Sequence, residues 1–88
     1  MTPYIRQSKR VKYESCIQEI LKILKGVPVE KVDGELSYVI TRILKGLYEP
    51  SYFNYNRALG VLEAAKHEFY RRIVAPYEDR KMEENGDV

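Results

Sequence analysis

Apolar residues recur at helical spacing along two segments of the chain. Over residues 13–25 and again over 34–47, they occupy the i, i+3, i+4 and i+7 positions that make one stripe of a helix. The pattern therefore predicts two amphipathic helices. Their stripes consist of Tyr13, Cys16, Ile17, Ile20, Leu21 and Leu24, and of Leu36, Val39, Ile40, Ile43, Leu44 and Leu47.

The segment between these two helices is expected to be a loop. Gly26 suits a left-handed residue just past a helix end, and Pro28 prevents the first helix from continuing. Asp33 is expected to cap the second helix, because its carboxylate accepts backbone N–H groups. That helix ends at Gly46, or it continues through the glycine and stops before Pro50.

A third, longer helix is predicted over about residues 54–84, after an aromatic turn over 48–55. Ser51 or Asn54 can cap its start. Pro76 lacks an N–H and clashes with the carbonyl four residues earlier, so we expect a kink there.

The predicted fold class is therefore all-α: a three-helix domain whose long third helix is kinked at Pro76. At 88 residues the chain has room for one domain, which we place at 13–85, between a basic arm over 1–12 and a tail over 86–88. The third helix carries apolar or small residues on more of its circumference than one bundle face needs. We therefore expect a homo-oligomer.

Composition narrows the class of protein. Hydrophobic residues are 44% and charged residues 32%, as in ordinary globular proteins, and no apolar run approaches the ~18 residues of a membrane span. The single cysteine, Cys16, excludes an internal disulfide and is expected to be buried. No signal-peptide pattern follows the early charges, so we expect a cytoplasmic protein.

Charge is unevenly distributed although its sum is small. Fifteen basic against thirteen acidic residues give +2, which is too little to indicate nucleic-acid binding by itself. The basic arm and the acidic end (Glu83, Glu84 and Asp87) can both be solvated termini. Alternatively, the arm of one subunit can pair with the acidic end of another, or the arm can bind phosphates. The candidate nucleic-acid residues are Arg6, Lys9, Arg10, Lys12, Asn56 and Arg57.

The sequence favours a protein without catalytic activity. His67 is the only histidine, so a two-histidine metal site within one chain is excluded, and no glycine-rich phosphate loop occurs. Glu63, His67 and Arg71 are spaced four residues apart and are expected to form a ladder on one helix face. We expect no catalytic residue, no metal and no cofactor.

Tyrosine and arginine form the most informative cluster. The chain has eight tyrosines and no tryptophan. Arginine binds phosphate or carboxylate in a bidentate manner, and tyrosine stacks or donates a hydroxyl. Such residues suit a subunit or partner contact, a pocket for an anionic ligand, or nucleic acid. The candidate ligand or interface residues are Tyr38, Thr41, Arg42, Tyr70, Arg71, Arg72, Tyr77 and Arg80.

Two segments, GELSYVITRIL over 34–44 and EFYRRIVAPYEDRKMEENGDV over 68–88, carry a resemblance to known proteins. They resemble a family of small, uncharacterised all-helical proteins of bacteriophages and bacteria, over about two-thirds of the chain, with the first 30 residues outside. The resemblance implies a small cytoplasmic accessory protein of viral or bacterial origin, with no activity to carry over. The matching residues are Gly34, Leu36, Tyr38, Thr41, Tyr70, Arg71, Arg72, Pro76, Tyr77, Glu78 and Asp79.

Together these features predict a non-enzymatic, cytoplasmic binding protein, located in the bacterial host cell if it is encoded by a phage. Its partner is a nucleotide-like anion or a host protein, bound through the tyrosine and arginine cluster, in addition to copies of itself. Two alternatives stay open: a small nucleic-acid-binding regulator and a purely structural protein–protein interaction module. No membrane partner is expected.

Overall fold

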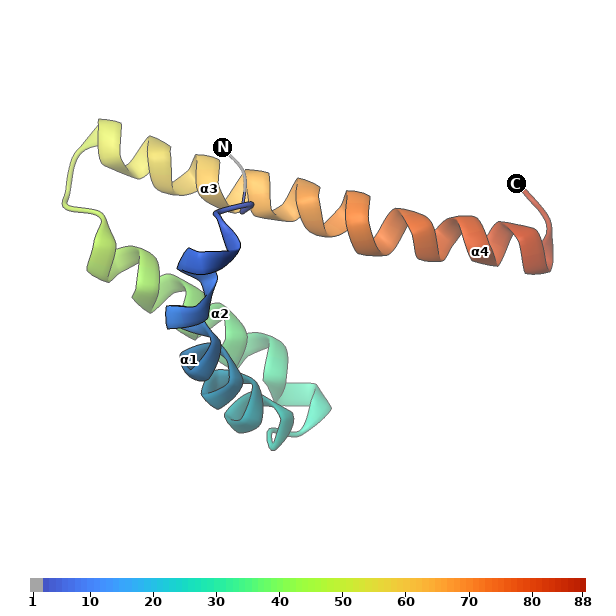
Figure 1. Ribbon diagram of the computed structural model, residues 1–88, viewed down its shortest axis with the longest axis horizontal. Coiled ribbons are helices and arrows are strands. Elements are labelled where there is room, and N and C mark those ends of the chain that lie inside the picture. Colours follow the sequence, from blue (N-terminus) through green and yellow to red (C-terminus); the bar gives the residue numbers. More distant parts are fainter. Residues whose placement is uncertain (1–2) are drawn as a thin grey trace. The chain divides into compact units, whose positions relative to one another are not determined.

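The computed structural model describes residues 3–88, and within that range every regular element is helical (Figure 1). Helices α1 and α2 are followed by α3, a π-helical segment η1 and α4, which continue into one another without a break. The prediction of an all-α chain with a long third helix is confirmed. The elements are α1 (Gln7–Lys25), α2 (Val29–Leu47), α3 (Tyr52–Phe69), η1 (Tyr70–Val74) and α4 (Ala75–Asn85).

The described chain divides into two compact units. One unit, Tyr4–Tyr55, contains α1, α2 and the first residues of α3. The other contains Asn56–Val88, which is the rest of α3 together with η1 and α4. Of residues 3–88, only Ala58 is buried, and the other side chains are half-buried or exposed.

In the first unit, α1 and α2 contact each other as an antiparallel hairpin (Figure 1). The side chains that lie between them are half-buried: Ile20 and Leu24 from α1, Val27 from the turn, and Val32 and Val39 from α2. The predicted apolar stripes therefore meet, but two helices alone leave much of each stripe exposed.

Helix α1 begins six residues before the predicted start at Tyr13, so residues 7–12, half of the basic arm, are helical. The apolar stripe does not reach this turn of the helix, which is why periodicity missed it, and its only aliphatic side chain, Val11, is 74% exposed. Lysine, arginine and glutamine are good helix formers without any stripe. Met1 and Thr2, the first residues of the predicted arm, lie outside the described residues.

The turn between α1 and α2 is shorter than predicted. Gly26 has φ −84°, so the left-handed conformation expected there is wrong; the turn closes when the N–H of Gly26 donates to the carbonyl of Ile23 at 3.1 Å. Helix α2 begins at Val29, with Pro28 rather than Asp33 as its N-cap residue. The carbonyl of Pro28 accepts the N–H of Lys31 at 2.9 Å and that of Val32 at 3.1 Å. Proline favours this position because its fixed φ suits the approach to a helix.

The other helix ends follow the sequence more closely. Helix α2 continues through Gly46 and ends at Leu47, the second of the two predicted endings. Ser51 caps α3: its Oγ accepts the N–H of Asn54 at 3.0 Å. The chain leaves α4 through Gly86, whose φ of 90° is easily adopted only by glycine.

The predicted distortion near Pro76 takes the form of a π-helical turn immediately before it. The N–H of Ala75 donates to the carbonyl of Tyr70, five residues earlier instead of four. Pro76 cannot donate to the carbonyl of Arg72, and its ring would collide with that carbonyl in a regular helix. The wider turn accommodates the ring while the helix continues.

Candidate functional site

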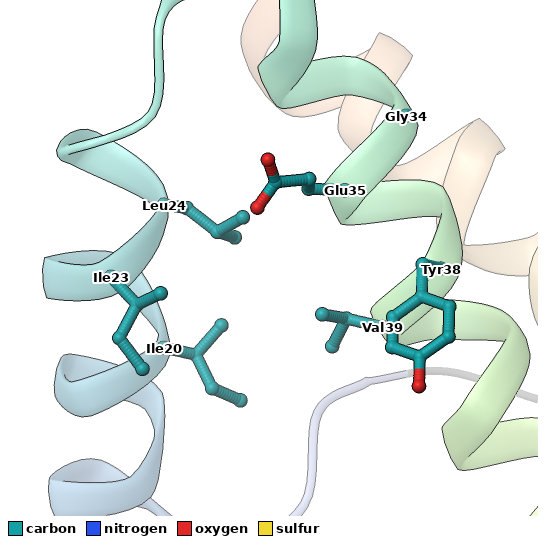
Figure 2. A pocket seen from close by; sticks show the side chains of 7 residues that line it. All are labelled: Ile20, Ile23, Leu24, Gly34, Glu35, Tyr38 and Val39. Atoms are coloured by element: carbon teal, nitrogen blue, oxygen red, sulfur yellow. The ribbon is translucent and has the colours of Figure 1, made fainter.

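An apolar pocket of about 320 Å³ lies between α1 and α2 (Figure 2). Both helices contribute to it because their stripes face each other at an angle that leaves one side of the hairpin open. Gly34 lines the pocket on the α2 side, and a Cβ there would meet no atom within 4 Å. The lining residues are Ile20, Ile23, Leu24, Gly34, Glu35, Tyr38 and Val39.

Two polar side chains border this pocket. Figure 2 shows the carboxylate of Glu35 reaching from α2 toward Leu24 of α1. The Tyr38 hydroxyl accepts a hydrogen bond from Arg42 Nη1 at 3.0 Å, and the guanidinium lies 5.9 Å from the centre of the same ring. Glu35 is the only charged residue among those that line the pocket.

A second, more open hollow of about 480 Å³ lies further along α2. Arg42, Lys45 and Gly46 line it, so its charge is positive. Thr41, which we had grouped with Tyr38 and Arg42, is exposed on α2. The α2 part of the predicted cluster thus borders an apolar pocket with an acidic rim on one side and a basic hollow on the other.

The other predicted cluster residues lie in the second unit, and several are bound to neighbours on the same helix. Arg71 Nη2 contacts Glu68 Oε2 at 2.9 Å, and its Nε donates to Oε1 at 3.3 Å. The Tyr70 hydroxyl donates to Glu78 Oε1 at 3.0 Å. This hydrogen bond, together with the negative charge of Glu78, raises the pKa of Tyr70 above its ordinary value.

Two cations that follow Tyr77 by about one helical turn lie close to its ring. The Arg80 guanidinium is 5.9 Å and the Lys81 ammonium 5.5 Å from the centre of its ring. Arg72 is exposed beside them. This part of the cluster belongs to the unit Asn56–Val88, whereas Tyr38, Thr41 and Arg42 belong to Tyr4–Tyr55, so the predicted cluster draws its residues from both units.

The candidate nucleic-acid residues also fall into two groups. Arg6 precedes α1, while Lys9, Arg10 and Lys12 are exposed in its first two turns. Arg10 Nε donates to the carbonyl of Ile5 at 2.7 Å, and the Lys12 ammonium lies 5.1 Å from the Tyr13 ring.

Asn56 and Arg57 are in the second turn of α3, because that helix begins earlier than predicted. They therefore belong to the other unit from the basic residues of α1.

His67 and Cys16, the residues considered as catalytic or reactive groups, lie on the surface. His67 Nε2 contacts Glu63 Oε1 at 3.0 Å, but Arg71 turns to Glu68, so the predicted three-residue ladder is only half formed. A hydrogen bond and the charge of Lys66 lower the pKa of Glu63, and His67 adds to the effect. Cys16 is exposed, which corrects the expectation of a buried thiol. Between residues 3 and 88 no group of histidine, cysteine or carboxylate side chains could hold a metal ion.

Sequence reasoning missed Glu35, the charged member of the pocket. It lies one position outside the apolar stripe of α2. The available signal was its spacing: Glu35, Tyr38 and Val39 are three and four residues apart, so they share a helix face.

The fold and the pocket define a small all-helical protein with an apolar cavity between two exposed helices. No helix in the part of the chain that the structure describes has the length and apolar character needed to cross a membrane.

The chain belongs to the family described as Domain of unknown function (DUF6899), whose model matches residues 2–88. The expectation of an uncharacterised family is confirmed, and the match includes the first 30 residues that the resemblance had left out. No curated protein and no solved structure matches the chain.

Proposed function

We propose that this protein is a non-enzymatic binding protein whose ligand is another protein. Its α1–α2 pocket takes up an amphipathic helix that carries apolar side chains and a basic residue. The observation that supports this function is the lining of the pocket, which is apolar except for Tyr38 and the carboxylate of Glu35. Apolar grooves of this kind bind the apolar face of a helix, and an acid at the rim favours a lysine or arginine.

The charges argue against an anionic, nucleotide-like ligand in the same pocket. A phosphate beside Glu35 would be repelled, since like charges in a partly desolvated site are costly. Arg42 already donates to Tyr38, and Arg71 is held by Glu68. An anion at Arg71 would therefore compete with the carboxylate of Glu68, whereas Arg42 keeps further N–H donors beside its bond to Tyr38.

The basic hollow on α2 supports a second candidate function, the capture of a phosphate-bearing small molecule. Arg42 and Lys45 are the cations that line it. The hollow is open and borders no apolar wall that could hold a base or a ring, so we rank this candidate below protein binding.

The proposal of a protein without catalytic activity rests on the residues present. His67 is paired with Glu63 on an exposed helix surface, and proton transfer would need a nucleophile or substrate group within hydrogen-bond reach. The bacteriophage origin, the cytoplasmic location and the nucleic-acid-binding alternative stay predictions.

Isothermal titration calorimetry with two designed peptides tests the proposed function. The first is an amphipathic helical peptide with leucine at i, i+3, i+4 and i+7 and lysine at its polar positions; the second has glutamate in place of lysine. We expect micromolar binding of the lysine peptide only. Glu35→Gln should weaken it about fivefold, as expected for a half-exposed charge pair. The matched control is Glu30→Gln, an exposed acid on α2 that does not line the pocket.

Two results would overturn the proposal. Equal binding of the lysine and glutamate peptides would show that Glu35 does not select a cation. Binding of a nucleoside diphosphate or triphosphate that is lost in Arg42→Ala, with no binding of either peptide, would favour the second candidate function instead.

A further inference from the structure

The face of α2 that points away from the pocket is an apolar surface without a cover in the hairpin. Leu36, Ile40, Ile43 and Leu47 are 43%, 37%, 50% and 70% exposed. With 3.6 residues per turn these four side chains fall within an arc of about 60° on the helix. Ile40 lies about 160° around the helix from Tyr38, which lines the pocket. The hairpin therefore has two distinct faces, one with the pocket and one that is purely apolar.

Helix α1 contributes to the same apolar face. Ile17 is 49% and Leu21 39% exposed. Leu21 lies about 160° around α1 from Ile23, which lines the pocket. We call the surface formed by Ile17, Leu21, Leu36, Ile40, Ile43 and Leu47 the apolar face.

We propose that the apolar face is the contact between two copies of this chain, and that α2 packs antiparallel against α2 of the second copy. The two hairpins then form a four-helix bundle, in which each hairpin supplies the cover that the other lacks. Such a contact is isologous, because a two-fold axis brings the same surface together on both sides. The pocket with Glu35 and Tyr38 stays on the outside, so this contact is independent of the proposed function.

The spacing along α2 supports a second copy as the occupant. The intervals between Leu36, Ile40, Ile43 and Leu47 are four, three and four residues, which is the heptad spacing of packed helices. This series is the same when it is followed in the opposite direction. A two-fold axis between Thr41 and Arg42 therefore sets Leu36 opposite Leu47 of the second copy, and Ile40 opposite its Ile43.

The charges of α2 favour the antiparallel orientation. The first half of the helix carries three acids, Glu30, Asp33 and Glu35, against one base, Lys31, whereas the second half carries the bases Arg42 and Lys45. An antiparallel pair places each acidic half beside the basic half of the other copy. The dipoles of the two helices then point in opposite directions, which is also favourable. A parallel pair would align like charges along the whole helix, which is unfavourable.

The side of the hairpin that carries the apolar face approaches the area of a standard specific interface. Two helices of 19 residues side by side span about 28 Å by 20 Å. Because side chains make this surface uneven, the accessible area that each copy would bury is of the same order as the roughly 800 Å² per partner of a standard specific interface.

The mass of the full chain in solution, measured by light scattering after gel filtration at about 100 µM, is the first test. We expect twice the mass of one chain. Ile43→Glu should weaken the dimer on the order of a hundredfold or more, because it brings two buried charges into one symmetric contact. The matched control, Tyr38→Glu on the pocket face, should leave the dimer intact. A monomer at this concentration would overturn the proposal. In that case α3 of the same chain would be the element that covers the apolar face.

Disulfide trapping in a Cys16→Ser background tests the orientation without a disruptive charge. In the proposed dimer, residue 40 of one chain lies close to residue 40 of the other chain across the two-fold axis, within the range that a disulfide can span. Oxidation should therefore link the Ile40→Cys variant into a covalent dimer at least about tenfold faster than the Tyr38→Cys variant. Equal rates at both positions, or faster linking through the pocket face, would contradict the proposed contact.

Discussion

The α1–α2 hairpin and the long helix of α3, η1 and α4 are both helical, but they distribute their apolar side chains differently. In α2 these side chains share one continuous arc, and α1 contacts one edge of that arc. In α3, Phe53, Leu59 and Phe69 are 73%, 64% and 62% exposed and point in different directions around the helix. A single apolar arc specifies where a neighbour packs, whereas apolar side chains all around a helix call for cover on several sides.

The second unit, Asn56–Val88, compensates with short-range contacts between exposed side chains. Lys66 and His67 contact Glu63, Arg71 contacts Glu68, and Lys81 contacts Glu84 at 3.2 Å. Pairs three or four residues apart on a helix contribute only a few tenths of a kcal/mol each. These pairs therefore add little to the stability of the long helix, whereas half-buried apolar side chains lie between α1 and α2 in the hairpin.

The largest expected effect comes from a charge placed between the two helices of the hairpin. Ile20→Asp should cost about 2–4 kcal/mol, since it buries a carboxylate without a partner. Phe69→Asp, at an exposed position of the long helix, should cost less than about 1 kcal/mol. Urea unfolding followed by circular dichroism at one fixed protein concentration measures both. Equal losses in the two variants would show that the long helix is packed as closely as the hairpin.

Replacement of the proline that follows the π-helical turn should have a moderate effect. In Pro76→Ala the new N–H can donate to the carbonyl of Arg72, so a regular helix becomes possible and stability should rise by about 1–2 kcal/mol. NMR of backbone hydrogen bonds should show the N–H of Ala75 move from Tyr70 to Arg71 as acceptor. Pro50→Ala, before the helix, is the control and should leave that acceptor unchanged. A π turn that persists without the proline would contradict this origin.

Loss of the cap at the start of α3 should be smaller again. Ser51→Ala removes the oxygen that accepts the N–H of Asn54 and should cost about 1 kcal/mol. Ser37→Ala, at an exposed position inside α2, should instead raise stability by a few tenths of a kcal/mol, because alanine is the better helix former. Thermal unfolding of the two variants beside the parent protein measures the difference, and a loss in Ser37→Ala as large as in Ser51→Ala would argue against the cap.

The smallest effect concerns the pH dependence of the contact between Tyr70 and Glu78. Because the folded pKa of Tyr70 is raised, this contact stabilises the helix at pH values below the ordinary tyrosine pKa of about 10 and is lost as pH rises through the raised value. NMR of ring-labelled tyrosines should show that Glu78→Gln lowers the pKa of Tyr70 toward its ordinary value. The matched control is Glu83→Gln, an exposed acid of α4, which should leave the pKa of Tyr70 unchanged. An unchanged Tyr70 pKa would contradict the hydrogen bond.

The sequence predicted the three helices and the distortion near Pro76 because these depend on local chemistry: apolar period, capping residues and the missing N–H of proline. It placed the starts of α1 and α2 too late, since the basic turn before Tyr13 and the segment around Val29 and Asp33 form helix without a clear apolar stripe. Cys16 was expected to be buried because it belongs to the stripe, yet a hairpin of two helices covers only part of that stripe.

The candidate site was predicted only in part. Tyr38 and Arg42 were correctly placed on one helix face, four residues apart, and they contact each other. That Tyr38 lines an apolar pocket with Glu35 depends on the packing of α1 against α2, which the sequence of either helix alone does not contain. Arg71 was expected to continue the ladder of Glu63 and His67, but its guanidinium contacts Glu68, three residues earlier on the helix.

A map of amide chemical shifts in the ¹⁵N-labelled full chain, recorded as the lysine peptide is added, tests most directly whether the two faces of the hairpin have different roles. The account predicts that the largest shifts occur at Ile23, Gly34 and Tyr38 around the pocket, while Ile40 and Leu47 on the apolar face hardly move. Shifts that centre on Ile40 and Leu47 instead, with the pocket residues unchanged, would contradict it.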